Sequence, residues 1–156
     1  MAIDLNPGVY YKDQKGAIHN ANHGFRYEVQ LDNSAAAAVT VGQLVKIKNV
    51  AGQHGVPVVE ACTAITDRPF GMVAYQNKQD TFAAGEILTI ASDYTIITCE
   101  AAGAVNAGVD VMYAAAQKVD VAAGAGTYAI GTALTPAAAD GDLIRVLLRK
   151  PEKLTA

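Results

Sequence analysis

His19 and His23 are the one pair of histidines spaced closely enough in the sequence to share a metal ion. A spacing of four residues would place both rings on one face of a helix, where their nitrogens could ligate zinc. Asn20, Asn22 and Gly24 surround the pair and disfavour a helix, and neither a cysteine nor the third histidine is close in sequence. We therefore expect solvated loop imidazoles and no metal site. His54, within Ala-Gly-Gln-His-Gly-Val, is expected at an exposed hairpin tip.

Two serines and two cysteines are the candidate nucleophiles, and such a group needs an oriented base beside it. Ser34 and Ser92 lie in turn-like contexts, outside the Gly-x-Ser-x-Gly elbow of the hydrolases. Cys62 and Cys99 end predicted strands, each with a glutamate rather than a histidine close by. We expect buried, unreactive thiols, and a disulfide is not expected in a reducing cytoplasm.

The acidic and glycine-rich segments show no catalytic pattern either. Glu86, Asp140 and Asp142 adjoin turn glycines, where acids serve turn chemistry. The sequence Gly124-Ala-Gly126-Thr lacks the lysine and the third glycine of a phosphate-binding loop. The charged loop Thr66–Gly71 predicts a turn with an internal ion pair. The chain is therefore expected not to be an enzyme and to need no cofactor.

The elements that must position these residues are predicted to be strands. Residues 25–31 alternate apolar and polar side chains, which places Phe25, Tyr27, Val29 and Leu31 on one face of a half-buried strand. Shorter β-branched and aliphatic runs bounded by Gly, Asn, Asp or Pro predict further strands. These runs are 44–48, 56–59, 87–90, 95–99 and 143–148. The alanine runs 35–38, 114–116 and 137–139 are too short to nucleate helices and predict loops or strand edges.

One pattern occurs four times along the chain. Gly42, Gly85, Gly108 and Gly141 each precede apolar residues at the third and fifth following positions, which share one face of a strand. The inward pairs predicted in this way are Val45 and Ile47, Leu88 and Ile90, Val111 and Tyr113, and Ile144 and Val146.

The same pattern groups into two halves. Residues 39–45 match residues 105–111, Phe70-Gly71 parallels Ile130-Gly131, and the segments 83–88 and 139–144 correspond. Two loosely repeated units over 39–100 and 105–150 would explain this correspondence, and the alternative is a chain without internal duplication. Either alternative predicts an all-β fold, a compact β-sandwich or β-barrel. The expected organisation is an extended N-terminal arm over 1–24, a β-domain over 25–150 and a short tail over 151–156.

The polar segment 1–24 is rich in turn residues and has no period. One interpretation is a loosely ordered arm in the isolated chain, because chain ends are often poorly tied down. The other is an arm that orders against a partner subunit.

Composition excludes several classes of protein. The 156 residues are 51% hydrophobic, 6% aromatic and 17% charged, which excludes intrinsic disorder, and two cysteines exclude a disulfide scaffold. No apolar run approaches a membrane span and no charged-then-apolar leader follows Met1, so a soluble protein made in the cytoplasm is expected. The net charge is −3 and the pI is near 5.5, which disfavours nucleic acid as a partner despite a basic stretch over 145–156.

Several motifs together resemble the phage capsid cement, or head decoration, proteins. They are Val-Thr-Val-Gly-Gln-Leu-Val from residue 39, Phe-Gly-Met-Val-Ala from 70, Ala-Gly-Glu-Ile-Leu-Thr-Ile from 84, Ala-Gly-Val-Asp-Val-Met-Tyr from 107, Ile-Gly-Thr-Ala-Leu from 130 and Asp-Gly-Asp-Leu-Ile-Arg-Val-Leu-Leu from 140. The resemblance covers residues 39–148, and the longer polar segment 1–34 departs from the shortest members of the family.

The resemblance implies a structural protein of the virion, located on the capsid exterior after synthesis in the host cytoplasm. Its implied partner is the major capsid protein, which such proteins bind at capsomer junctions, often as homotrimers, with neither nucleic acid nor membrane involved. In this chain we expect the arm and the strand 25–31 to make shell or intersubunit contacts. The expected contact residues are Tyr10, Tyr11, Phe25, Arg26 and Tyr27.

Two alternatives belong to other classes. A carbohydrate- or receptor-binding β-module of a phage fibre or tail appendage would need exposed aromatic side chains. The absence of tryptophan disfavours it, and the tyrosines that could serve are Tyr10, Tyr11, Tyr94, Tyr113 and Tyr128. An enzyme with a site that no motif marks is the second alternative.

Overall fold

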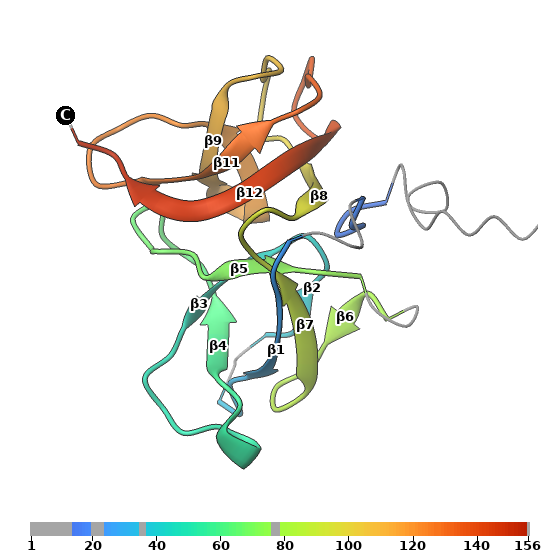
Figure 1. Cartoon of the computed structure of the whole chain (residues 1–156), viewed down its shortest axis with the longest axis vertical. Helices are drawn as coiled ribbons and strands as arrows, with labels where there is room; N and C mark the ends of the chain where they lie inside the picture. Colours follow the sequence, from blue (N-terminus) through green and yellow to red (C-terminus); the bar gives the residue numbers. More distant parts are fainter. Residues whose placement is uncertain (1–13, 20–23, 35–36, 76–78, 156) are drawn as a thin grey trace, which may run out of the picture.

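A computed structural model describes residues 14–19, 24–34, 37–75 and 79–155 (Figure 1). Its regular structure is almost entirely β, which confirms the predicted fold class. The only helical elements in these ranges are two 3-10 turns, η1 (Gln53–Gly55) and η2 (Ala115–Gln117). The strands are β1 (Arg26–Leu31), β2 (Val39–Thr40), β3 (Leu44–Ile47), β4 (Val58–Ala61), β5 (Gly71–Val73), β6 (Thr81–Phe82), β7 (Ile87–Ala91), β8 (Ile96–Glu100), β9 (Asp110–Ala114), β10 (Lys118–Val121), β11 (Tyr128–Ala133) and β12 (Leu143–Lys153).

Strands β1, β4, β3, β5 and β7 close into a five-stranded barrel in that order. All neighbouring pairs are antiparallel except β1 and β4, which run parallel where Gln30 lies opposite Val58 and Leu31 opposite Val59. Closure covers most of the sheet edges that would otherwise pair with other chains.

A second five-stranded sheet follows in the sequence, with the order β10, β9, β11, β12 and β8. A parallel bridge between Ala101, just after β8, and Val119 of β10 brings the two outer strands together. The sheet is therefore curled, with its two outer strands joined by this single bridge, and we call it the second barrel below. It stacks on one end of the first barrel (Figure 1).

The two barrels share one pairing scheme. Strands β1, β3, β4, β5 and β7 correspond in turn to β8, β9, β10, β11 and β12. With this correspondence, each antiparallel pair of the first barrel has a counterpart in the second: β1–β7 matches β8–β12, β3–β4 matches β9–β10, β3–β5 matches β9–β11, and β5–β7 matches β11–β12. The parallel contact of β1 with β4 corresponds to the Ala101–Val119 bridge. The β2–β6 pair of Val39 with Phe82 corresponds to the bridge between Val105 and Ala137. This correspondence groups β8 (Ile96–Glu100) with the second barrel, whereas the predicted unit 39–100 includes it. Internal duplication of the sequence stays a prediction.

The four glycines that were expected to begin strands all lie in tight turns with a left-handed backbone. Their φ angles are 78° at Gly42, 82° at Gly85, 87° at Gly108 and 90° at Gly141. Side chains with a Cβ rarely adopt this conformation, so glycine is the residue these turns require. The apolar residues predicted to point inward after them are buried, with Ile47 as the exception at 50% exposed.

Strand β1 is buried in its second half alone. Val29 and Leu31 are fully buried, whereas Tyr27 is 42% exposed and Phe25, just before the strand, is 53% exposed. The reason is that β4 pairs only with Gln30 and Leu31, so the first half of β1 lacks a neighbour on that side.

Both ends of the described chain are held more firmly than expected. Residues 14–19 pack between the barrels: the Gly16 and His19 amides donate to Thr98 and Ile96 of β8, and Ala17 is 1% exposed. At the other end, β12 continues through Pro151 to Lys153, where Tyr128 of β11 pairs with it after a bulge. The rest of the expected arm, residues 1–13 and 20–23, lies outside the described residues.

The barrels are joined by a common core. One cluster fills the first barrel, and a second cluster combines residues of the second sheet with Leu44, Cys62, Met72 and Ala91 from the first barrel. Tyr113 Oη also donates a hydrogen bond of 3.0 Å to the Cys62 carbonyl, which ties β9 to the end of β4. Within the described residues, no helix has the length and apolar character to cross a bilayer.

Candidate partner-binding surface

The two cysteines are placed as inert core residues. Cys62 and Cys99 are free thiols and are both fully buried. Burial raises the pKa of each to about 12, because a thiolate would lose its hydration in this environment. Since the thiolate is the reactive form, neither residue is suited to nucleophilic chemistry.

The histidines do not form a metal site in the part of the chain described. His19 is bonded to the Thr98 hydroxyl at 2.7 Å, and burial together with the nearby charge of Arg145 lowers its pKa. His54 is exposed in η1 with a φ of 53°, which confirms the predicted tip between β3 and β4. His23 lies outside the described residues. Among the residues described, no group of three or more His, Cys, Asp or Glu side chains could hold an ion.

Two of the three acidic residues next to turn glycines, Glu86 and Asp142, stabilise those turns, whereas Asp140 pairs with Lys118 at 2.7 Å. Glu86 Oε2 accepts a hydrogen bond of 2.7 Å from the Ala83 amide. Asp142 Oδ2 accepts bonds of 2.8 and 3.0 Å from the Ala138 and Ala139 amides, at the equivalent turn of the second barrel. These carboxylates therefore satisfy backbone donors that would otherwise need water.

Three of the five expected contact residues lie in the described structure, and they are adjacent in sequence. Phe25, Arg26 and Tyr27 are all exposed at the start of β1. The Phe25 ring lies 6.2 Å from that of Tyr94, and the Tyr27 ring lies 5.4 Å from that of Phe70. Tyr10 and Tyr11 lie outside the described residues. A role for any of the five in binding a partner stays a prediction.

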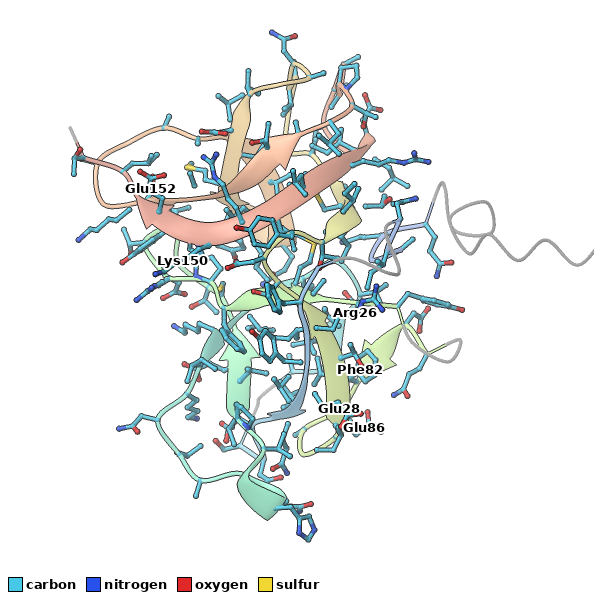
Figure 2. The ribbon with its side chains drawn as sticks, viewed as in Figure 1. Arg26, Glu28, Phe82, Glu86, Lys150 and Glu152 are labelled. Carbon is cyan, nitrogen blue, oxygen red and sulfur yellow. The ribbon has the colours of Figure 1, made fainter. Side chains whose placement is uncertain are left out.

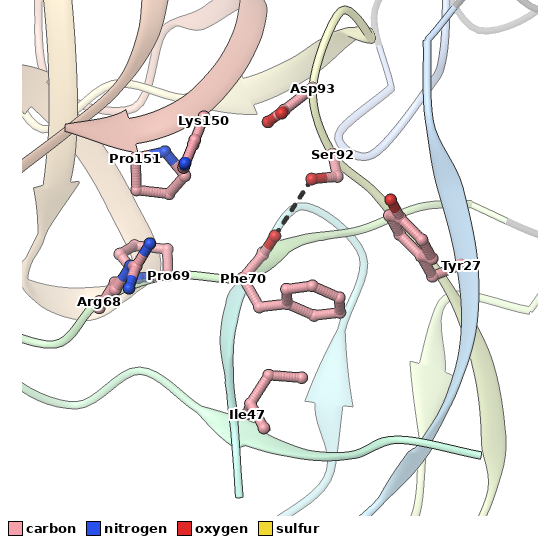
Figure 3. Close-up of a pocket in the computed structure, with 9 residues that line it drawn as sticks. All are labelled: Tyr27, Ile47, Arg68, Pro69, Phe70, Ser92, Asp93, Lys150 and Pro151. Carbon is pink, nitrogen blue, oxygen red and sulfur yellow. Dashed lines mark hydrogen bonds between the residues drawn. The ribbon is translucent and has the colours of Figure 1, made fainter. Parts of the chain in front are cut away.

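Tyr27 borders a hollow of about 500 Å³ where the two barrels meet, which we call the junction hollow (Figure 3). Its walls come from β1, β3, the loop before β5, the turn after β7 and the second half of β12. The lining residues are Tyr27, Ile47, Arg68, Pro69, Phe70, Ser92, Asp93, Lys150 and Pro151.

The loop Thr66–Gly71 supplies one wall of the junction hollow, and its ion pair differs from the expected one. Asp67 pairs with Lys46 of β3 at 2.8 Å and accepts hydrogen bonds from the Thr63 and Ala64 amides. Partial burial alone would raise the pKa of this carboxyl, but the hydrogen bonds outweigh it and the pKa is lowered. Asp67 is therefore paired with β3, and its sequence neighbour Arg68 lines the hollow.

Charge around the junction hollow is mainly positive. Lys15, Lys46, Lys48, Lys118 and Arg149 pair with carboxylates elsewhere in the described structure. The structure shows no such pair for Arg68 or Lys150 within its described ranges, and Asp93 is the one acidic side chain in the lining. Lys150 and Glu152 are both exposed side chains of the last part of β12 (Figure 2).

Sequence reasoning found Tyr27 but missed Ile47, Phe70, Arg68 and Lys150 as neighbours. The pattern after Gly42 selected Ile47 as a core residue, and the loop carrying Arg68 and Phe70 was noted for its charge. The sequence does not show that β3, this loop and β12 line the same hollow. Their proximity depends on how the second barrel stacks on the first.

A smaller hollow of about 390 Å³ also borders Tyr27. Arg26 and Glu28 point to this outer side of β1 (Figure 2). Its lining residues are Ile18, Arg26, Tyr27, Glu28, Ala74, Tyr75 and Thr89. Tyr27 therefore borders two surface depressions.

The described chain is thus a β-module built from a closed five-stranded barrel and a second, curled five-stranded sheet. Comparison with solved structures gives a similar fold in the crystal structure of the head fiber gp8.5 N base of bacteriophage phi29. The match has a TM-score of 0.57 and 12% sequence identity, and it covers 86% of this chain and 100% of the other. No protein-family model matches the sequence, and no curated protein matches it.

Proposed function

We propose that this chain is a structural protein of a phage virion that binds the outer surface of the assembled head. The observation that carries the proposal is the likeness of fold to a head fiber base, which spans nearly the whole of both chains. It agrees with the sequence resemblance to capsid decoration proteins, which was drawn from different features. The sequence resemblance implies the major capsid protein as the partner, and we propose that partner here.

The side chains also favour binding over catalysis. The thiols are buried, and Glu86 and Asp142 next to turn glycines accept hydrogen bonds from backbone amides. What the described surface offers is exposed aromatic and aliphatic side chains at the start of β1 and around the junction hollow. Many copies on a closed lattice can add weak contacts of this kind into firm attachment, and a homotrimer would place three equivalent surfaces on the shell.

A second candidate is an anchoring module at the base of a head appendage, and the printed description of the structural neighbour as a head fiber base favours it. The two roles differ in copy number. A decoration protein would occupy every equivalent capsomer junction and strengthen the shell, whereas an appendage base would occupy few sites and leave shell stability unchanged.

Co-sedimentation with assembled heads of the phage that encodes the chain tests the proposal. We expect saturable binding to mature heads and none to free capsid subunits. The copy number at saturation, with the temperature at which decorated and bare heads disrupt, separates decoration from an appendage base. Failure to bind heads at micromolar concentrations would contradict both.

A further inference from the structure

We propose that the junction hollow binds an extended segment of a partner protein through an apolar side chain followed by a carboxylate. The partner is taken to be a protein of the phage head, and in this respect the inference rests on the proposed function. The chemistry of the site is argued from this chain alone.

The apolar part of the hollow consists of side chains that a barrel would normally bury. Ile47 points to the same side of β3 as the fully buried Val45, yet it is 50% exposed. Tyr27 has the same relation to the buried Val29 on β1. Phe70 lies against Tyr27 with ring centroids 5.4 Å apart (Figure 3). These three side chains surround a space that an apolar side chain of a partner would fill.

The rim of the hollow selects the charge of the occupant. Arg68 and Lys150 are exposed, come from opposite barrels, and have no carboxylate partner in the described ranges. Asp93 offsets one of the two charges, so the rim keeps a net positive charge. An arginine fork and an ammonium together suit a carboxylate, which makes an acidic group the complementary ligand.

The polar groups suit a peptide better than a sugar. Sugar sites present free aromatic faces together with several acceptors for hydroxyl groups. Here the Tyr27 and Phe70 rings lie against each other, the Ser92 hydroxyl is bonded to the Phe70 carbonyl, and Asp93 is the one carboxylate. A hollow of about 500 Å³ holds one large side chain and the backbone beside it, and its position between two closely packed barrels makes it preformed.

The test uses two capped peptides, acetyl-Gly-Phe-Asp-Gly-amide and its Asn counterpart, titrated into the whole chain and followed by NMR. We expect millimolar binding, with shift changes centred on Ile47, Arg68 and Lys150. At low salt the Asp peptide should bind about 3–10-fold tighter than the Asn peptide, as expected for two partly exposed charge contacts. Absence of these shifts, or equal binding of the two peptides, would overturn the proposal.

Matched variants identify the site. Ile47→Gln should weaken both peptides, whereas Ile87→Gln, which changes an isoleucine of similar exposure (46%) away from the hollow, should not. Arg68→Gln combined with Lys150→Gln should remove the preference for Asp, and Lys153→Gln should leave it. Because all these side chains are exposed, the variants are expected to keep the circular dichroism spectrum of the native chain. N-acetylneuraminate binding in the hollow without any peptide preference would identify a sugar site and overturn the inference.

Head binding by the same variants separates the two proposals. If the native chain and the Arg68/Lys150 variant bind heads equally, the proposed function stands and the hollow is not the contact. If the peptides bind as expected but the native chain does not bind heads, the proposed function fails and the peptide site stands.

Discussion

Gly71 and Gly131 occupy equivalent places in the two barrels, on β5 and β11. A Cβ at Gly71 would lie 2.6 Å from the carbonyl oxygen of Ala91, and one at Gly131 would lie 2.4 Å from that of Leu147. Each contact is to backbone of the next strand, which cannot move aside without disturbing the ladder. The correspondence that the sequence showed between Phe70-Gly71 and Ile130-Gly131 therefore has a steric cause.

Gly131→Ala is expected to lower the free energy of unfolding by about 1–3 kcal/mol, the usual cost of forcing extra atoms into a packed site. Urea denaturation followed by circular dichroism measures the change. Gly103→Ala is the control, because a Cβ there meets no atom within 4 Å. Equal stability of the two variants would show that β11 and β12 are not so closely packed.

Asp67 gives a prediction of pH dependence. Its pKa is lowered in the folded protein, so its contribution to stability is present above the ordinary value of 3.8 and is lost as the pH falls through the lower folded value. Asp67→Asn should lower stability by about 1 kcal/mol at pH 7, after allowance for solvent screening. The difference from the native chain should shrink below pH 3.8.

Stability of the Asp67 variant is measured by denaturant titration at several pH values. Glu152→Gln, at an exposed carboxylate, is the control and should change stability by less than about 0.5 kcal/mol throughout. A deficit for Asp67→Asn that stays constant down to pH 2 would mean that its cause is packing rather than charge.

At the scale of elements, residues 14–19 form hydrogen bonds with both barrels: Gly16 bonds to Thr98 of the second barrel and to Tyr75, which follows β5 of the first. Gly16 has a φ of 78°, and a Cβ there would lie 2.6 Å from Val41 Cβ. The amides of His19 and Thr98 donate to Ile96 and Ala17 across this contact. The segment therefore adds hydrogen bonds along the edge of β8 that β12 does not cover.

Gly16→Ala should release this segment locally. We expect hydrogen exchange at the His19 and Thr98 amides to become faster by about tenfold or more, because each 1.4 kcal/mol of lost local stability is a factor of ten. The amides of β9, which lies on the other side of the second sheet, serve as the internal control. An equal change in both sets would indicate global destabilisation instead of local release of residues 14–19.

The strands and their turns could be predicted from the sequence, because both depend on local signals. The alternation in 25–31 and the glycines before β3, β7, β9 and β12 located these elements closely. The stacking of the barrels could not be predicted, since it depends on residues distant in sequence, such as Tyr113 with Cys62. Residues 151–153 were expected in the tail but belong to β12, for a similar reason. Glu152 and Lys153 pair with the first residues of β11, before its bulge, and that pairing is not visible in the local sequence.

The candidate site was accessible to sequence reasoning only in part. Tyr27 and Arg26 were selected because they lie on an alternating strand. Ile47 was assigned to the core by its spacing from Gly42. That spacing does not show how far the neighbouring strands β1 and β4 stay paired, and so cannot show which inward-pointing side chains are left exposed. Lys150 lies beyond the predicted strand 143–148, so its place beside Arg68 in the lining of the hollow could not be foreseen.

At the scale of the whole molecule, the two barrels are expected to unfold together. Their shared core includes Leu44, Met72 and Ala91 from the first barrel, and Tyr113 of the second is bonded to Cys62 of the first. Separation of the barrels would expose this apolar surface, which favours a single cooperative transition. Differential scanning calorimetry should give a ratio of calorimetric to van't Hoff enthalpy near 1. Two resolved transitions would mean that each barrel is an independent folding unit.

We propose that this two-barrel module is attached to the outside of a phage head. A cryo-electron microscopy reconstruction of the virion that encodes the chain measures this directly. We predict density that fits both barrels at defined positions on the outer surface of the shell, in contact with the major capsid protein. Virions whose heads lack this density, with the chain found on the tail or missing from the particle, would contradict attachment to the head.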